Sequence, residues 1–143
     1  MLTTHVLHPQ ILGALGAAGH GSQILVADGN YPFSTGSPPG ATRVYLNLVP
    51  GVVDAVTVAA ALAAAMPVEA AVTMRPDTDD EPAIVADFRS ALPPGTPMST
   101  LPRADFYQAA RGVDVALVVA TAEQRLYGNL LLTIGVRAPD GHG

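Results

Sequence analysis

Residues 113–136 read VDVALVVATAEQRLYGNLLLTIGV, and this stretch indicates the fold class. Val113–Ala120 and Asn129–Val136 are rich in leucine and β-branched residues, which is typical of buried strands. The polar segment Thr121–Gly128 joins them and leaves no room for a crossover helix. We therefore expect these two strands to form an antiparallel pair within a β-sheet.

The remainder of the chain alternates between strand-like and helix-like segments. The sequence predicts helices from Pro9 to Ala18, over Val52–Met66, through Ala86–Leu92 and over Ala104–Ala110, and strands over Ser22–Ala27, Arg43–Leu48, Val68–Met74 and Met98–Leu101. Such alternation predicts an α/β fold, a single layered domain with a mixed β-sheet flanked by helices. We expect the domain to cover residues 1–137, with a flexible tail over 138–143.

The segment Val52–Met66 is apolar almost all round, and Asp54 is its only charged residue. A helix without a polar face is usually buried on more than one side. We therefore expect this helix to be covered on more than one side.

Composition excludes several kinds of chemistry. The 143 residues include 12 acidic side chains and 7 basic ones, all arginine, which gives a net charge of −5. Without lysine there is no Schiff-base chemistry, and without cysteine there are no thiol nucleophiles, disulfides or zinc-thiolate sites. The acidic balance argues against a nucleic-acid partner.

The hydropathy pattern bears on location and assembly. No signal peptide is evident, and the longest uncharged apolar run, Ala55–Val68, is shorter than the ~20 residues that a membrane span needs. We therefore expect a soluble, cytoplasmic protein with no membrane partner. Only 13% of residues are charged, against a typical value of about 25%. So few charges suggest that self-association hides part of the surface.

Two candidate functional residues flank the strand predicted at Ser22–Ala27. His20 stands between Gly19 and Gly21, where it is either a general acid/base or a C-terminal cap of the preceding helix. Asp28 closes the strand, at the edge where α/β sheets bind ligands. The alternative for Asp28 is an Asx turn that bonds its own loop backbone.

Further candidates lie at other element boundaries. Tyr127-Gly128-Asn129 precedes the last strand and carries neutral hydrogen-bonding groups, although it could be an ordinary turn. Arg103 and Arg43 also lie at boundaries, where an arginine is usually solvated. The carboxylates of residues 77–81 lack metal-ligand spacing with any histidine, and no glycine-rich segment matches a phosphate-binding loop.

Taken in order, these residues resemble a known family. The pattern comprises Gly19-His20-Gly21, Asp28, Tyr31-Pro32, Arg43, Val68-Glu69-Ala70-Ala71, Arg103 with Phe106-Tyr107, and Tyr127-Gly128-Asn129. It resembles the D-ribose pyranase/L-fucose mutarotase family over residues 1 to 137. Each of these motifs alone is a weak indication of the family, whereas the ordered set is a strong one.

The resemblance implies an isomerase that interconverts forms of a monosaccharide with no cofactor and no metal. His20 matches the acid/base histidine of the family. The positions that match its sugar-contacting residues are Asp28, Arg103, Tyr127, Gly128 and Asn129. Fucose-type members carry arginine where Arg103 stands and ribose-type members carry histidine, so a mutarotase of L-fucose or a related sugar is favoured. The alternatives are a D-ribose pyranase and a monosaccharide-binding protein without catalysis.

The spacing of His20 and Asp28 has a geometric consequence. An intervening strand would separate them by up to ~26 Å at ~3.3 Å per residue, far more than one monosaccharide spans. We therefore hypothesise a site at a subunit interface, with His20 supplied by a neighbour. The resemblance agrees, since it implies a ring-like homo-oligomer, often a decamer.

Overall fold

The structure is a computed structural model that describes residues 1–139. These residues contain four helices and six strands joined by loops. In chain order they are α1 (Pro9–Ala17), β1 (Gln23–Ala27), β2 (Thr42–Tyr45), α2 (Ala55–Ala65), β3 (Val68–Arg75), α3 (Ile84–Ala91), β4 (Met98–Pro102), α4 (Arg103–Ala110), β5 (Val115–Ala120) and β6 (Leu130–Ile134). Each of them corresponds to a helix or strand predicted from the sequence. Most of the expected tail, from residue 140 onward, lies outside the described residues.

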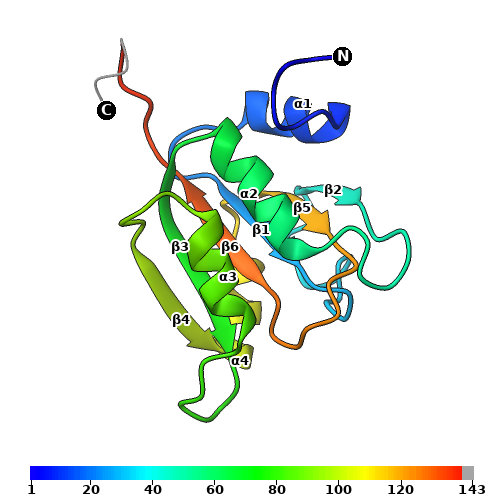
Figure 1. The fold of residues 1–143 in the computed structure, drawn as a ribbon, viewed down its shortest axis with the longest axis vertical. Coiled ribbons are helices and arrows are strands. Elements are labelled where there is room, and N and C mark those ends of the chain that lie inside the picture. The colour runs from blue at the N-terminus through cyan, green and yellow to red at the C-terminus, as the bar shows by residue number, and fades with distance from the viewer. Residues whose placement is uncertain (140–143) are drawn as a thin grey trace.

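The strands form one mixed sheet in the order β2-β5-β1-β6-β3-β4 (Figure 1). Strand β6 is antiparallel to both of its neighbours, β1 and β3, whereas the other neighbouring pairs are parallel. The predicted α/β fold with a mixed sheet is thus confirmed. This arrangement places the carboxyl ends of the other five strands at the same end of the sheet as the beginning of β6. We call this end of the strands the edge that carries the pocket residues.

The predicted C-terminal strand pair needs a correction. Strands β5 and β6 run in opposite directions, as expected, but they are not hydrogen-bonded to each other because β1 lies between them. The connection between them crosses the end of β1, where the Thr121 N–H donates to the Ala27 carbonyl and the Gly29 N–H donates to the Glu123 carbonyl. An apolar strand such as β1 is most stable with a partner on each edge.

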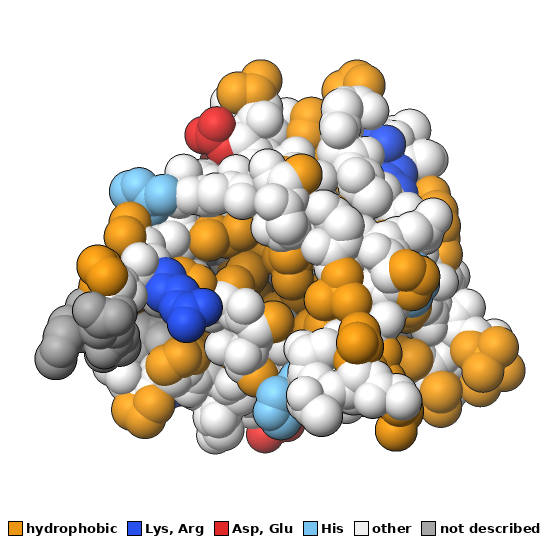
Figure 2. All heavy atoms as spheres, turned by 90° about the horizontal axis from the view of Figure 1, so that it is seen from above, with side chains coloured by type: hydrophobic (Ala, Val, Ile, Leu, Met, Phe, Trp, Pro, Cys, Tyr) orange, Lys and Arg blue, Asp and Glu red, His pale blue; other side chains and the backbone are white. Residues whose placement is uncertain are grey.

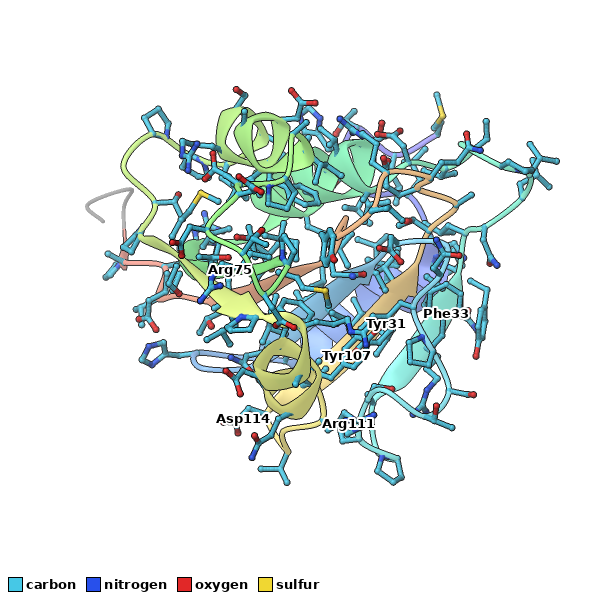
Figure 3. All side chains as sticks on the ribbon, turned by 90° about the horizontal axis from the view of Figure 1, so that it is seen from below. Tyr31, Phe33, Arg75, Tyr107, Arg111 and Asp114 are labelled. Carbon is cyan, nitrogen blue, oxygen red and sulfur yellow. The ribbon has the colours of Figure 1, made fainter. Side chains whose placement is uncertain are left out.

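The core lies on both faces of the sheet. Ile24 and Val26 of β1 point into a cluster beneath α1, α2 and α3, whereas Leu25 and Ala27 point into a second cluster that includes Phe106 of α4. Helices α2 and α3 lie on one face in Figure 1, and Figure 3 shows α4 on the opposite face. This sandwich holds both ends of β1 rigidly. No helix in residues 1–139 is both long and apolar enough to span a membrane.

Helix α2 differs from its prediction. It begins at Ala55, and Asp54 is its N-cap, whose carboxylate accepts a hydrogen bond from the Thr57 N–H at 3.1 Å. Within the single chain α2 buries one side, comprising Ala55, Val58, Ala59 and Leu62. The expectation of burial on more than one side is met in part, because α2 packs on β1 of the sheet and beside α3, whereas its outward residues are largely small alanines. Figure 2 shows apolar side chains exposed over much of the face seen from above, some of them in a hollow at its centre.

Candidate active site

A pocket lies at the edge of the sheet where β1 and β4 end and β6 begins. It has a volume of about 280 Å³ and is lined by Asp28, Asn30, Met74, Arg103, Tyr107, Leu126, Tyr127 and Asn129. The topology explains this gathering, since Asp28 follows β1, Arg103 follows β4 and Asn129 precedes β6. Four residues singled out from the sequence, far apart along the chain, therefore surround one cavity.

The carboxylate of Asp28 is the centre of the polar network in this pocket. Asp28 is only 4% exposed. Its Oδ1 accepts a hydrogen bond from the Asn30 N–H at 3.0 Å, which is the Asx-turn contact expected of a strand-ending aspartate. Its Oδ2 accepts from the Gly128 N–H and from Nδ2 of Asn129, both at 3.2 Å. In return, Oδ1 of Asn129 accepts a hydrogen bond from the Asp28 N–H at 2.7 Å. We call this reciprocal pair of hydrogen bonds between Asp28 and Asn129 the polar clasp.

The electrostatics of Asp28 follow from this burial. Burial raises the pKa of Asp28 above its ordinary value, and the hydrogen bonds from the backbone of Asn30, Gly128 and Tyr31 and from the side chain of Asn129 oppose that rise. Removal of these hydrogen-bond donors would raise the pKa of Asp28 further and favour its protonated form. The network therefore holds an almost fully buried hydrogen-bond acceptor at the base of the pocket.

The turn at Tyr127-Gly128-Asn129 is packed too tightly for larger residues. A Cβ at Gly128 would lie 2.9 Å from Cγ of Glu123 and 3.0 Å from the Arg125 carbonyl oxygen. Tyr127 adopts a left-handed backbone with φ of 60°, which is rare outside glycine and costs energy that the surrounding structure must supply. This backbone lets Tyr127 line the pocket while the Gly128 N–H reaches Asp28.

Helix α4 supplies the opposite wall. Arg103 is its first residue, is exposed, and forms no ion pair within residues 1–139. Tyr107 follows one turn later and also lines the pocket. Its ring meets Tyr31 edge-on at 5.1 Å, and the Arg111 guanidinium lies 5.9 Å from its centroid (Figure 3). Sequence reasoning did not assign Tyr107 to the site, although its spacing of four from Arg103 on a predicted helix places both on one face.

Arg43, the other boundary arginine, has a structural role. Its guanidinium donates to the carbonyl oxygens of Phe33, Ser34 and Pro38 and to Oγ of Ser37, at distances from 2.9 to 3.3 Å. These bonds hold the loop that leads away from Tyr31. Arg43 therefore organises a loop near the pocket and does not line it.

A larger pocket of about 450 Å³ adjoins the first through Asn30 and includes Glu123. The carboxylate of Glu123 is already occupied, because it accepts from the Ala55 N–H at 3.3 Å and from Nε of Arg125 at 2.6 Å. That carboxylate therefore holds the start of α2 in place. Within residues 1–139, no group of three or more histidine, aspartate or glutamate side chains is arranged to hold a metal ion.

His20 lies at the opposite edge of the sheet, before the amino end of β1. The idea that it caps α1 is wrong, since the C-cap is Ala18 and the His20 ring bonds elsewhere. Nε2 of His20 lies 2.8 Å from Oε1 of Glu69, and the two side chains are 57% and 49% exposed. Because β1 separates the two edges, a single chain does not bring His20 to the pocket around Asp28.

Comparisons with known proteins identify the family of this chain. The model of the RbsD / FucU transport protein family matches residues 1–137. The chain belongs to this family. It is 32% identical over 136 residues to the D-ribose pyranase of Paracidovorax citrulli (strain AAC00-1), covering 95% of this chain and 98% of that protein. It is also 31% identical over 142 residues to the fucose mutarotase of Homo sapiens, covering 93% and 91%.

The fold of this RbsD / FucU chain also matches a solved structure. Bacillus subtilis RbsD complexed with D-ribose superposes with a TM-score of 0.82 at 24% sequence identity, covering 96% of this chain and all of the other. This likeness concerns the fold, which the two proteins share over almost the whole of this chain. The family resemblance read from the ordered residues is thereby confirmed.

Proposed function

We propose that the protein is a cytoplasmic monosaccharide mutarotase that interconverts the anomers of L-fucose or a related sugar by acid/base-assisted ring opening and closure. The observation that carries the proposal is the convergence of Asp28, Arg103, Tyr127 and Asn129 on one pocket. Relatives of two kinds match the chain, a D-ribose pyranase and a fucose mutarotase. The second candidate is therefore a D-ribose pyranase that interconverts pyranose and furanose forms.

The size and lining of the pocket suit one sugar ring. Its volume of about 280 Å³ is below the range of about 300–1,000 Å³ that drug-sized ligands occupy. The walls combine apolar and aromatic surface from Met74, Tyr107 and Leu126 with polar groups from Asp28 and Asn129. A monosaccharide presents C–H faces and directional hydroxyls, which match these two kinds of surface.

Arg103 favours a fucose-type substrate in this proposal. Its free guanidinium at the pocket wall carries five N–H donors in a rigid fork and can bind two sugar oxygens at once. The Tyr31 N–H donates to the backbone carbonyl of Asp28 at 3.2 Å, and the hydrogen bond to Oδ1 comes from Asn30, so Oδ1 can also accept from a sugar hydroxyl. Together these groups fix the sugar by directional contacts.

Ring opening needs only proton transfer. A base removes the proton of the anomeric hydroxyl, the C1–O1 bond becomes a carbonyl, the bond from C1 to the ring oxygen breaks, and that oxygen takes up a proton. Closure of the aldehyde on its other face reverses each step, so no reagent is consumed. We assign His20 as the proton donor and acceptor, because histidine changes charge near neutral pH. Tyr127, which lines the pocket, is the candidate for the complementary relay.

Because His20 lies at the other edge, the complete site in this proposal forms between two copies of the chain. A neighbour would direct its His20 edge toward the pocket around Asp28, and repetition of this contact around a ring would build the homo-oligomer, for which we propose a decamer. Such a head-to-tail contact closes into a ring when its rotation allows.

The proposed activity is tested by saturation-transfer NMR on L-fucose and on D-ribose. The wild-type protein should accelerate exchange between sugar forms above the buffer rate, and H20A should abolish the acceleration while sugar binding remains. H5A, which removes an exposed histidine near the chain start, serves as the matched control. Unchanged exchange in H20A would refute the mechanism. Binding without accelerated exchange in the wild type would leave only a sugar-binding protein, and faster exchange of ribose forms than of fucose anomers would favour the pyranase.

The interface site is tested by mixing two inactive variants. H20A and D28N should each be inactive alone, whereas co-expressed chains should regain roughly a quarter of the activity, because random assembly pairs an intact His20 with an intact Asp28 at that share of the interfaces. No recovery in verified mixed oligomers would mean that each site takes His20 and Asp28 from the same chain, and would refute the shared site.

A further inference from the structure

One side-chain pair outside the pocket has a specific geometry. Nε2 of His20 lies 2.8 Å from Oε1 of Glu69. An ionised carboxylate only accepts hydrogen bonds, so Nε2 carries the proton and Nδ1 of the neutral ring carries the lone pair. Within residues 1–139, Glu69 is the one residue that hydrogen-bonds this ring. The contact therefore sets both the ring orientation and the tautomer.

The backbone of β3 is irregular at Glu69. Val68 pairs with Ile134 and Ala70 pairs with Thr133, so Glu69 is an extra residue opposite that step of β6. Bulges of this kind turn a side chain away from the regular alternation of the strand, and they are frequent beside active sites. Here the extra residue is the one whose carboxylate reaches His20.

The end of β6 ties both partners together. The Gly21 N–H donates to the Ile134 carbonyl, and the Gly135 N–H donates to the Pro67 carbonyl. The turn that carries His20 and the segment that leads to Glu69 are thus fastened to adjacent residues of one strand end. Gly135 has no side chain of its own, and a Cβ there would lie only 3.4 Å from Cβ of Glu69.

We propose that Glu69 is a positioning residue for the His20 acid/base group, which it holds with Nε2 engaged and Nδ1 turned to the sugar. This inference rests on the proposed function, because it assigns a partner to the histidine of that reaction. The proton of the anomeric hydroxyl moves to Nδ1, and the resulting imidazolium stands beside the Glu69 carboxylate. The carboxylate stabilises that charge and stays ionised throughout, as the third member of an acid/base chain does in other enzymes.

Glu69 variants separate orientation from charge. E69Q keeps an oxygen acceptor for the Nε2 proton and removes the negative charge, whereas E69A removes both. We expect kcat for sugar exchange to fall about tenfold in E69Q and further in E69A, with KM little changed, because Glu69 lies outside the pocket. E69D should restore part of the kcat lost in E69A. E81Q, which removes the carboxylate of the exposed Glu81–Arg89 ion pair, is the matched control and should retain wild-type kcat.

A double-mutant cycle distinguishes this inference from the proposed function. Because Glu69 acts through His20, E69Q should not lower any further the exchange that H20A retains above the buffer rate. Equal kcat in E69Q and wild type would overturn the positioning role while loss of exchange in H20A upheld the proposed function. An undiminished effect of E69Q in the H20A background would also overturn it, since Glu69 would then act independently of the histidine. Misfolding of E69A would be recognised by circular dichroism, and E69Q, which is nearly isosteric with glutamate, then decides the outcome.

Discussion

Replacement of Asn129 by aspartate is the sharpest test of the polar clasp in the pocket. In the structure Nδ2 of Asn129 donates to Oδ2 of Asp28 over 3.2 Å in a buried site. N129D preserves the shape and the oxygen that accepts from the Asp28 N–H, but it turns this attraction into a contact between two carboxylates. The substitution therefore isolates the contribution of one amide donor.

The magnitude follows from the separation of the two groups. Two unit charges 3.2 Å apart repel each other by about 5 kcal/mol at an effective dielectric constant of about 20. The pair avoids this cost by binding a proton, so its pKa in the folded state rises above the value in the unfolded chain. The folded state of the variant then binds more protons than the unfolded state, and stability falls as the pH rises.

We expect N129D to lose up to about 5 kcal/mol of unfolding free energy relative to wild type at about pH 9, and much less at about pH 5. Urea denaturation followed by circular dichroism, at one protein concentration because of self-association, measures both values. The double variant D28N/N129D carries one carboxylate and should lose the pH-dependent part, retaining a constant cost from the Gly128 N–H that no longer meets a carboxylate. A destabilisation of N129D that is equal at both pH values would refute the reasoning.

Two further substitutions test supporting structure. D54A should lose about 1 kcal/mol at neutral pH because it removes the N-cap of α2, whereas D54N should lose little. Burial tends to raise the pKa of Asp54, but hydrogen bonds from Thr57 outweigh it and the pKa is lowered. The loss in D54A should therefore shrink as the pH falls through that lowered pKa, which urea denaturation at neutral pH and at a pH below that pKa measures. R43K should speed amide hydrogen exchange over residues 33–38 and cost about 1–2 kcal/mol, because one ammonium cannot replace a fork that bonds several carbonyls. R89K, at an exposed ion pair, should leave that exchange unchanged.

Local patterns determined the elements and half of the residues that line the pocket. Runs such as Ile24–Ala27 predict a buried strand, because a strand between two layers needs apolar residues on both faces. Asp28 is a candidate because it ends a predicted strand, where α/β sheets bind ligands. Arg103 lies at a predicted element boundary, and the family resemblance makes it a candidate. The separation of His20 from Asp28 follows from the strand predicted between them and from the rise of an extended chain.

Only the tertiary structure decided which strands are neighbours. Strand β1 lies between β5 and β6, which are close to each other in sequence but far from β1. Pairing between segments that are far apart in sequence is not encoded in any local pattern. The same holds for Tyr107, which reaches the pocket because α4 covers the face opposite α2 and α3. The contact between His20 and Glu69 depends on the register of β3 against β6 and on the extra residue at that step. Register is a property of paired backbones, so it appears only once the sheet has formed.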